Sequence, residues 1–213
     1  MQTNLPGAAH EIEFWKGFVK SDRFINGWLP DNIKTPDLVQ EVADFFLAQP
    51  DAEVLDCGSG VVSILRGTVP NEKLKMCDVL AYEYEKIFDY KAHGIIPPFP
   101  SACEELIFDG MFDIVHISNA LDHCQQPDKA FWAMYRAVKP GGFLVVQGFT
   151  NEGTFEKWQG MHNWDLDIEN NLLTLADKTR LCTVLASKPY TAKKITLETG
   201  KEWFIFIQQK PSA

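Results

Sequence analysis

The pattern that most constrains this chain is an alternation of strand-like and helix-like segments between residues 35 and 149. Short apolar runs with the length of buried strands occur at 53–56, 73–78, 112–117 and 143–149. Segments with apolar residues at helical spacing occur at 35–50, 82–90 and 128–138. Such alternation implies right-handed crossovers and a mainly parallel sheet with helices on both faces. We therefore expect an α/β chain.

The two ends of the chain differ from this alternating region. Residues 8–20 carry apolar side chains at helical spacing, and a loop rich in turn formers follows over 21–34. Thr35 and Pro36 then have the residue types of an N-cap and a first helical position. After residue 150 the pattern predicts two hairpins, with turns at Asn170-Asn171 and Thr199-Gly200. Antiparallel strands at the end of a parallel sheet are physically common.

Charge and composition disfavour several classes of partner. The formal net charge is −9 and no cluster of basic residues is present, so general attraction to nucleic acid or anionic lipid is weak. The 5 cysteines are scattered without a C-x-x-C pair, which argues against a disulfide framework and a cysteine-rich zinc site. The N-terminus lacks the pattern of a signal peptide, and no apolar run approaches the roughly 20 residues that span a bilayer. We expect a reduced, cytoplasmic protein without nucleic-acid or membrane partners; the oligomeric state is open.

The segment VLDCGSG at 54–60 carries the clearest chemical signal. Asp56 ends a strand, and the glycines of the following Gly58-Ser59-Gly60 turn let the backbone approach a ligand closely. Ligands of open α/β sheets bind at the carboxyl ends of the strands, where Asp78 also lies and can accept hydrogen bonds from both hydroxyls of a ribose. The dinucleotide pattern G-x-G-x-x-G is not met, because Ser63 occupies the third glycine position. A tight turn without a ligand is the alternative interpretation.

This segment, Asp78, and the run FDIVHISNALDHCQQPDKAFWAMYRAVKPGGFLVV at 112–146 together resemble class I S-adenosylmethionine-dependent methyltransferases, in particular the small-molecule group called type 11. The resemblance covers roughly residues 35–150. It implies a Rossmann-like, doubly wound, mainly parallel sheet with antiparallel C-terminal strands and helices on both faces. It also implies S-adenosylmethionine as cofactor, with S-adenosylhomocysteine as product. We expect one domain over 1–213, with an N-terminal helical lid at 1–34, a cofactor-binding core at 35–150, and acceptor-side hairpins and C-terminal strands at 151–213.

The resemblance also implies which residues meet the cofactor. The glycine turn would frame its methionine part, and Asp78 would hold its ribose. The segment SACEEL at 101–106 matches the adenine segment of the family, although Ala102 stands where the family often has Asp. Val62 replaces a further family glycine, and 63–70 is expected to form a short helix. The expected cofactor-binding residues are Asp56, Gly58, Ser59, Gly60, Asp78, Ala102, Cys103, Glu104 and Ser118.

Methyl transfer from a sulfonium is an in-line displacement that needs an aligned nucleophile, a dry pocket and sometimes a base. Alignment alone supplies up to roughly 7–11 kcal/mol in favourable cases. Asn119, Asp122 and His123 follow the strand at 112–117 and are the expected catalytic residues, with His123 as base because a free imidazole titrates near neutrality. Its alternative role is to hold a loop by hydrogen bonding. His116, in the middle of the strand, is expected to be a satisfied interior histidine.

The acceptor is expected to contact aromatic residues from both ends of the chain. The run WQGMHNW follows the last parallel strand, and a packed loop is its alternative interpretation. No H-x-x-x-H pattern or paired acidic cluster has ligand spacing, so we predict no metal site. The expected substrate-binding residues are Trp15, Trp158, His162 and Trp164.

These observations predict methyl transfer to an oxygen or nitrogen of a small-molecule acceptor, with a sugar or secondary metabolite as the favoured class. Two alternatives stay open. A methyltransferase-like binding or scaffold subunit without turnover is motivated by Ala102 and Val62. A nicotinamide-dependent oxidoreductase would use a similar sheet. Binding of S-adenosylhomocysteine separates the first alternative from the enzyme, and a response to NADH alone would support the second.

Overall fold

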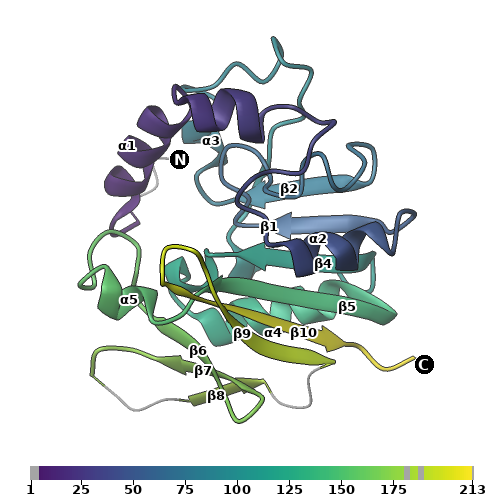
Figure 1. The fold of residues 1–213 in the computed structure, drawn as a ribbon, viewed down its shortest axis with the longest axis vertical. Helices are drawn as coiled ribbons and strands as arrows, with labels where there is room; N and C mark the ends of the chain where they lie inside the picture. Colours follow the sequence, from purple (N-terminus) through teal and green to yellow (C-terminus); the bar gives the residue numbers. More distant parts are fainter. Residues whose placement is uncertain (1–4, 180–182, 187–189, 213) are drawn as a thin grey trace.

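The computed structural model describes residues 5–179, 183–186 and 190–212. Its centre is a seven-stranded sheet in the order β3-β2-β1-β4-β5-β10-β9 (Figure 1). Neighbouring strands from β3 to β5 are parallel, whereas β10 is antiparallel to both β5 and β9. This order confirms the predicted Rossmann-like sheet with antiparallel C-terminal strands. The strands are β1 Val54–Cys57, β2 Leu74–Asp78, β3 Phe99–Pro100, β4 Phe112–Ser118, β5 Val138–Phe149, β9 Thr191–Thr196 and β10 Glu202–Gln209.

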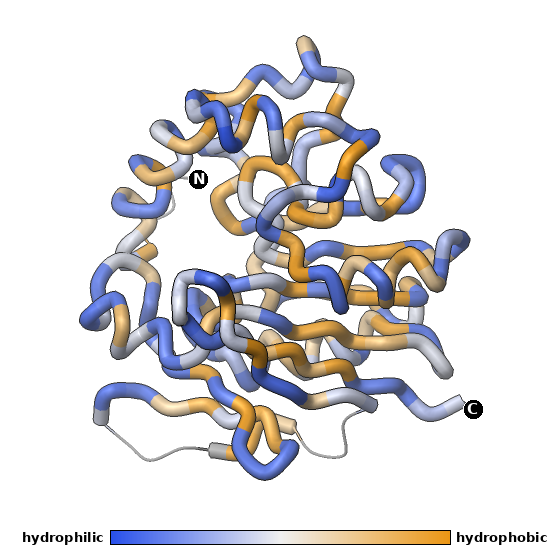
Figure 2. The backbone as a smooth tube through the Cα atoms, viewed as in Figure 1, coloured by the Kyte–Doolittle hydropathy of each residue, from blue (hydrophilic) through white to orange (hydrophobic). Residues whose placement is uncertain are grey.

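Helices cover both faces of this sheet because alternate side chains of a strand point to opposite sides. Val115 and Ile117 of β4 belong to the core cluster that contains helix α4, Pro127–Ala137. Ile114 belongs to the cluster on the other face, which contains helix α2, Gln40–Leu47. In Figure 1, α2 lies in front of the sheet and α4 behind it. The tube in Figure 2 is mainly apolar along the central strands, which are buried on both faces.

The remaining helical segments are short, apart from the first one. No helix among the described residues is both long and apolar enough to cross a bilayer. Helix α1 and helix α5 lie at the edge of the molecule toward which β1 and β2 point (Figure 1). The segments are α1 Ala8–Phe18, a π-helical turn at Phe24–Trp28, α3 Ala81–Tyr84, 3₁₀ turns at Cys103–Glu105 and Leu121–His123, and α5 Glu152–Phe155.

The two predicted hairpins are present, but they belong to different sheets. β6 Asp165–Glu169 and β7 Leu172–Ala176 are antiparallel, with both turn residues, Asn170 and Asn171, at positive φ. Two consecutive residues in the left-handed conformation form the type of two-residue turn whose twist matches that of the flanking strands. With β8 Thr183–Ala186 they form a separate three-stranded sheet, while the β9–β10 hairpin extends the main sheet. The sequence did not predict the second sheet.

Three local predictions around the first half of the chain are wrong. Thr35 does not cap a helix: its hydroxyl donates to the carbonyl of Ile64, and α2 begins later, at Gln40. The predicted loop over 21–34 contains the π-helical turn. The helix predicted over 82–90 ends at Tyr84. At Thr35, a hydrogen bond with a distant part of the chain outweighs the local propensity.

The helix predicted after the glycine turn, at 63–70, is also absent. These residues form turns with an isolated bridge between Arg66 and Val69. The Arg66 side chain donates to the carbonyl of Leu29 at 2.7 Å, and Gly67 has φ 75°, with the Ile33 carbonyl where a Cβ would lie. Contacts with the N-terminal region, and not helical hydrogen bonds, therefore determine the backbone conformation of this segment.

Candidate functional site

A cavity of about 1620 Å³ opens at the carboxyl ends of β1, β2 and β4. Pockets for a single drug-sized ligand usually measure roughly 300–1,000 Å³, so this one has room for two small molecules. Asp122 and Trp158 are outside its lining. The predicted site residues that line it are Asp56, Gly58, Ser59, Gly60, Asp78, Ala102, Cys103, Glu104, Ser118, Asn119, His123, Trp15, His162 and Trp164.

The glycine turn and Asp78 form one hydrogen-bonded unit in this cavity. Gly58 and Gly60 have φ 61° and 66°, which residues with a side chain rarely adopt. One oxygen of the buried Asp78 carboxylate accepts the Gly60 N–H at 3.0 Å, and the other accepts the Leu80 N–H at 2.8 Å. Each oxygen has a second lone pair for a further donor. Burial raises the pKa of Asp78 to about 6, and the two backbone N–H groups limit the rise.

Asp56 faces the interior and holds the base of the turn. Its Oδ1 lies 2.7 Å from His116 Nδ1, and Ser63 donates its hydroxyl to the other oxygen. Gln147 accepts the indole N–H of Trp203 at 3.1 Å, so its amide nitrogen donates to His116 Nε2 at 2.8 Å. His116 Nδ1 therefore carries the proton that is donated to Asp56. His116 is a satisfied interior histidine, as predicted.

The predicted adenine segment is a 3₁₀ turn at Cys103–Glu105 beside the cavity. One carboxylate oxygen of Glu104 accepts the backbone N–H groups of Gln125 and Gln126, at 2.9 and 3.1 Å. These groups precede α4, so Glu104 stabilises the chain that enters this helix. A contact between Glu104 and adenine stays a prediction. Such a contact would use the second carboxylate oxygen of Glu104, which accepts neither of these N–H groups.

The four cysteines of the described residues do not form disulfides. Cys57, Cys77, Cys103 and Cys124 are buried free thiols. Burial raises the pKa of Cys57, which keeps that thiol protonated. The fifth cysteine, Cys182, lies outside the described residues.

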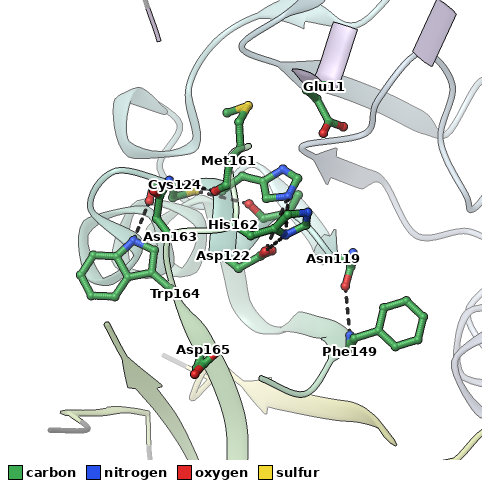
Figure 3. A network of polar contacts seen from close by, with 12 residues as sticks. Glu11, Asn119, Asp122, Cys124, Phe149, Met161, His162, Asn163, Trp164 and Asp165 are labelled. Atoms are coloured by element: carbon green, nitrogen blue, oxygen red, sulfur yellow. Dashed lines mark hydrogen bonds and ion pairs between the residues drawn. The ribbon is translucent and has the colours of Figure 1, made fainter. Parts of the chain in front are cut away.

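Asn119 follows β4 in a left-handed conformation, with φ 48°. Its side-chain oxygen accepts the Phe149 N–H at 3.0 Å, which ties the end of β4 to the end of β5 (Figure 3). The Asn119 side chain lines the cavity, and its hydrogen bond with Phe149 also stabilises the backbone there.

His123 does not stand alone in the lining of the cavity. His162 Nδ1 lies 2.7 Å from Asp122 Oδ2 and 3.2 Å from His123 Nε2 (Figure 3). Burial lowers the pKa of His162, but the hydrogen bond and charge of Asp122 outweigh it and raise the pKa overall. The sequence analysis assigned these residues to separate roles because His162 lies far along the chain, in the loop after α5.

Glu152 is a site residue that the sequence analysis missed. It is 5% exposed and lines the cavity, and its Oε2 has no hydrogen-bond partner among the described residues. Burial raises the pKa of Glu152, and the charge of Asp122 raises it further. Nothing in the sequence distinguishes a buried glutamate at the start of a short helix from a solvent-exposed one, so the burial of Glu152 could not be predicted.

The predicted aromatic residues divide between the cavity and the packing around it. Trp15 of α1 lies against the glycine turn: a Cβ on Gly60 would be 2.2 Å from its Cζ2. Trp164 lines the cavity and donates its indole N–H to the Cys124 carbonyl at 2.9 Å. Trp158 packs on Gly153 instead, where a Cβ would lie 2.9 Å from its ring.

Residues 55–146 match the family model described as a methyltransferase domain. A curated relative is the ubiquinone/menaquinone biosynthesis C-methyltransferase UbiE of Vibrio vulnificus strain YJ016, 33% identical over 112 residues. The match covers 48% of this chain and 43% of that relative. The chain thus spans less than half the length of the curated relatives it matches.

Solved methyltransferase structures share the fold at low sequence identity. The N-methyltransferase NodS of Bradyrhizobium japonicum superposes with a TM-score of 0.56 at 13% identity, over 81% of this chain and 96% of NodS. The 1,6-didemethyltoxoflavin-N1-methyltransferase of Burkholderia thailandensis, solved with its substrate and S-adenosylhomocysteine, has a TM-score of 0.52 at 13% identity, over 97% and 91%. Residues 55–146 of this chain are therefore similar to a methyltransferase domain, and the chain shares the fold of solved methyltransferases.

Proposed function

We propose that the protein transfers a methyl group from S-adenosylmethionine to a small-molecule acceptor. The observation that carries the proposal is the buried Asp78 carboxylate beside the Gly58–Gly60 turn, at the carboxyl ends of β1 and β2. Both oxygens of Asp78 keep a lone pair for the two hydroxyls of a ribose. The turn presents backbone without side chains where the rest of a nucleoside-bearing ligand passes.

The size and lining of the cavity support two ligands side by side. Asp78, the 101–105 segment, His123, His162 and Trp164 all line this cavity. The first two are proposed to bind the cofactor and the last three the acceptor. An in-line displacement needs the sulfonium methyl group and the acceptor atom in contact with water excluded, and adjacent sites in one cavity supply that. Trp15 and the rest of α1 are proposed as the lid over the cofactor end.

The acceptor atom is proposed to be oxygen or nitrogen of a sugar or secondary metabolite. Asn119, His123 and His162 offer polar groups to such an atom, while Trp164 offers an apolar wall. His123 as the base of the reaction stays a prediction. The name of the Vibrio relatives makes carbon the competing assignment, although they match only half of this chain.

Calorimetric titration of the full chain with S-adenosylhomocysteine tests the cofactor half of this proposal. We expect binding at a single site, weakened by about 1–3 kcal/mol in Asp78→Ala, because the polar groups of the ribose then lose their partner. Asp89→Ala, which changes an exposed aspartate outside the cavity lining, is the matched control and should bind like the wild type. Absence of binding at millimolar ligand would favour a scaffold subunit, and binding of NADH alone would favour an oxidoreductase.

The transfer itself is tested with methyl-labelled S-adenosylmethionine and a panel of hydroxyl, amine and carbon acceptors. Label found in a product of the hydroxyl or amine group supports the proposed acceptor class. Label found only on carbon would refute it while leaving the methyltransferase activity in place.

A further inference from the structure

Three side-chain atoms of the acceptor end converge on one point. Asp122 Oδ2 and His162 Nδ1 lie 2.7 Å apart, His162 Nδ1 and His123 Nε2 lie 3.2 Å apart, and His123 Nε2 and Asp122 Oδ2 lie 3.5 Å apart. Figure 3 shows the Asp122 carboxylate and the His162 ring at the centre of this network. All three atoms can donate a lone pair.

Hydrogen bonding does not satisfy this triangle well. A proton on His162 Nδ1 can be donated to one acceptor at a time. If it is donated to Asp122, then His123 Nε2 faces His162 Nδ1 without a hydrogen bond to it. A metal ion in tetrahedral coordination, with ligand bonds of about 2.0–2.1 Å, separates its ligand atoms by about 3.3 Å. The three observed separations bracket this value.

Glu152 supplies an independent observation at the same place. The residue is 5% exposed, and its Oε2 is buried without a hydrogen-bond partner among the described residues. Glu152 lines the same cavity as His123 and His162, and the charges of Asp122, His162 and Lys201 all act on its carboxylate. A buried carboxylate with an unpartnered oxygen is costly unless a donor or a cation reaches it.

We propose that Asp122, His123 and His162 form a binding site for a divalent transition-metal ion, with Glu152 of the same cavity as the acceptor of a metal-bound water. Two imidazoles with carboxylate oxygens and no thiolate suit ions such as Zn²⁺, Co²⁺ and Fe²⁺ better than Ca²⁺ or Mg²⁺. Three protein ligands with a position left open is the arrangement of catalytic zinc sites.

The open position faces the cavity, because His123, His162 and Glu152 all line it. An acceptor that offers a hydroxyl or other oxygen atom is the class of ligand that fits there, and a bound cation favours the ionised form of such a group. This assignment of the acceptor rests on the proposed function. The metal site itself does not, because the ion needs no cofactor to bind.

This inference replaces the prediction of no metal site that the sequence suggested. Asp122 and His123 are adjacent in sequence, and adjacent residues of a regular helix do not bind the same metal ion. His162 lies 39 residues after His123. The 3₁₀ turn at Leu121–His123 and the loop that follows α5 bring them together. The backbone N–H of Asn163 donates to the Asp122 carbonyl at 3.1 Å and holds this loop against the turn.

The test is a titration of the metal-free, tag-free full chain with Zn²⁺, followed by equilibrium dialysis. We expect one ion per chain in the wild type, with affinity at least tenfold lower in Asp122→Asn and in His162→Ala. His93→Ala is the matched control, since His93 is exposed and its ring stacks on Phe88 outside the cavity lining. Wild-type chain that binds no Zn²⁺, or variants that bind it as the wild type does, would overturn the site.

Titration of the wild type with Co²⁺ keeps the test decisive if a variant does not fold. Strong visible absorption of a four- or five-coordinate ion, with one equivalent at saturation, supports the site. The weak spectrum of hydrated octahedral Co²⁺ at every ratio overturns it. Titration of the same samples with S-adenosylhomocysteine separates the two proposals: loss of its binding with the metal retained counts against the proposed function alone.

Discussion

At the scale of single residues, Asp78 carries the strongest functional argument. Burial of this carboxylate disfavours its charged form, and the backbone N–H groups of Gly60 and Leu80 offset this in part. Because its folded pKa lies above the unfolded value, its contribution to the free energy of unfolding is fully present below about pH 4 and is lost as the pH rises through about 6. In the proposed function, ribose hydroxyls would reverse this preference by donating to the carboxylate.

The affinity for S-adenosylhomocysteine should therefore fall as the pH drops below about 6, the pKa of Asp78 without ligand. If only the ionised carboxylate binds, each further pH unit lowers the affinity by up to about tenfold. Calorimetric titration between pH 5 and 8 measures this profile. Asp78→Asn keeps the shape of the side chain without titrating, so its weaker binding should lose this dependence on pH. A wild-type affinity that is flat over this range contradicts the role of Asp78.

At the scale of elements, helix α1 and the turn after β1 depend on each other. The ring of Trp15 occupies the space next to Gly60, where a Cβ would approach Cζ2 to 2.2 Å. The indole N–H donates to Glu11 on the same helix at 2.8 Å, and the ring makes an edge contact with Trp28 at a centroid distance of 6.2 Å. Trp15 therefore packs against both the glycine turn and Trp28, and the N-terminal lid stays a prediction.

Gly60→Ala should lower the free energy of unfolding by about 1–2 kcal/mol for its left-handed backbone, plus a contribution from displacing Trp15. Gly94→Ala is the matched control: Gly94 has φ 63°, close to the 66° of Gly60, but nothing lies within 4 Å of its added Cβ. In a Trp15→Ala background, Gly60→Ala should no longer carry the cost of displacing the Trp15 ring. Urea unfolding of the two single variants and the double variant measures this difference as a double-mutant cycle. Equal costs at Gly60 and Gly94 would show that Trp15 is not constrained by the turn.

At the scale of the whole molecule, one chain of polar contacts crosses four adjacent strands. Asp56 of β1, His116 of β4, Gln147 of β5 and Trp203 of β10 are each buried and linked in this order. The chain couples the C-terminal antiparallel strand to the residue at the base of the glycine turn. Such a network is stabilising only while every member is satisfied.

Trp203→Phe should lower the free energy of unfolding by about 1–3 kcal/mol, because the buried oxygen of Gln147 loses its donor while most of the apolar contact remains. Trp132→Phe is the matched control, since the Trp132 side chain is 54% exposed on α4, and it should change stability little. Urea unfolding of both variants measures the difference. Equal costs in the two variants would mean that the indole donor of Trp203 is dispensable.

The order of strands and helices, the glycine turn, Asp78 and both hairpins could be predicted because each rests on local residue patterns of period, length and turn chemistry. The segment at 63–70 and Thr35 could not, because their partners are Leu29, Ile33 and Ile64 in other parts of the chain. The meeting of Asp122, His123 and His162 depended in the same way on how the loop after α5 packs against the 3₁₀ turn at Leu121–His123. Sequence alone determined the order of elements in the main sheet and the glycine turn with Asp78, since short-range patterning dictates both. Tertiary structure decided the cluster of Asp122, His123 and His162, since side chains from distant segments come within bonding distance there only after the chain has folded.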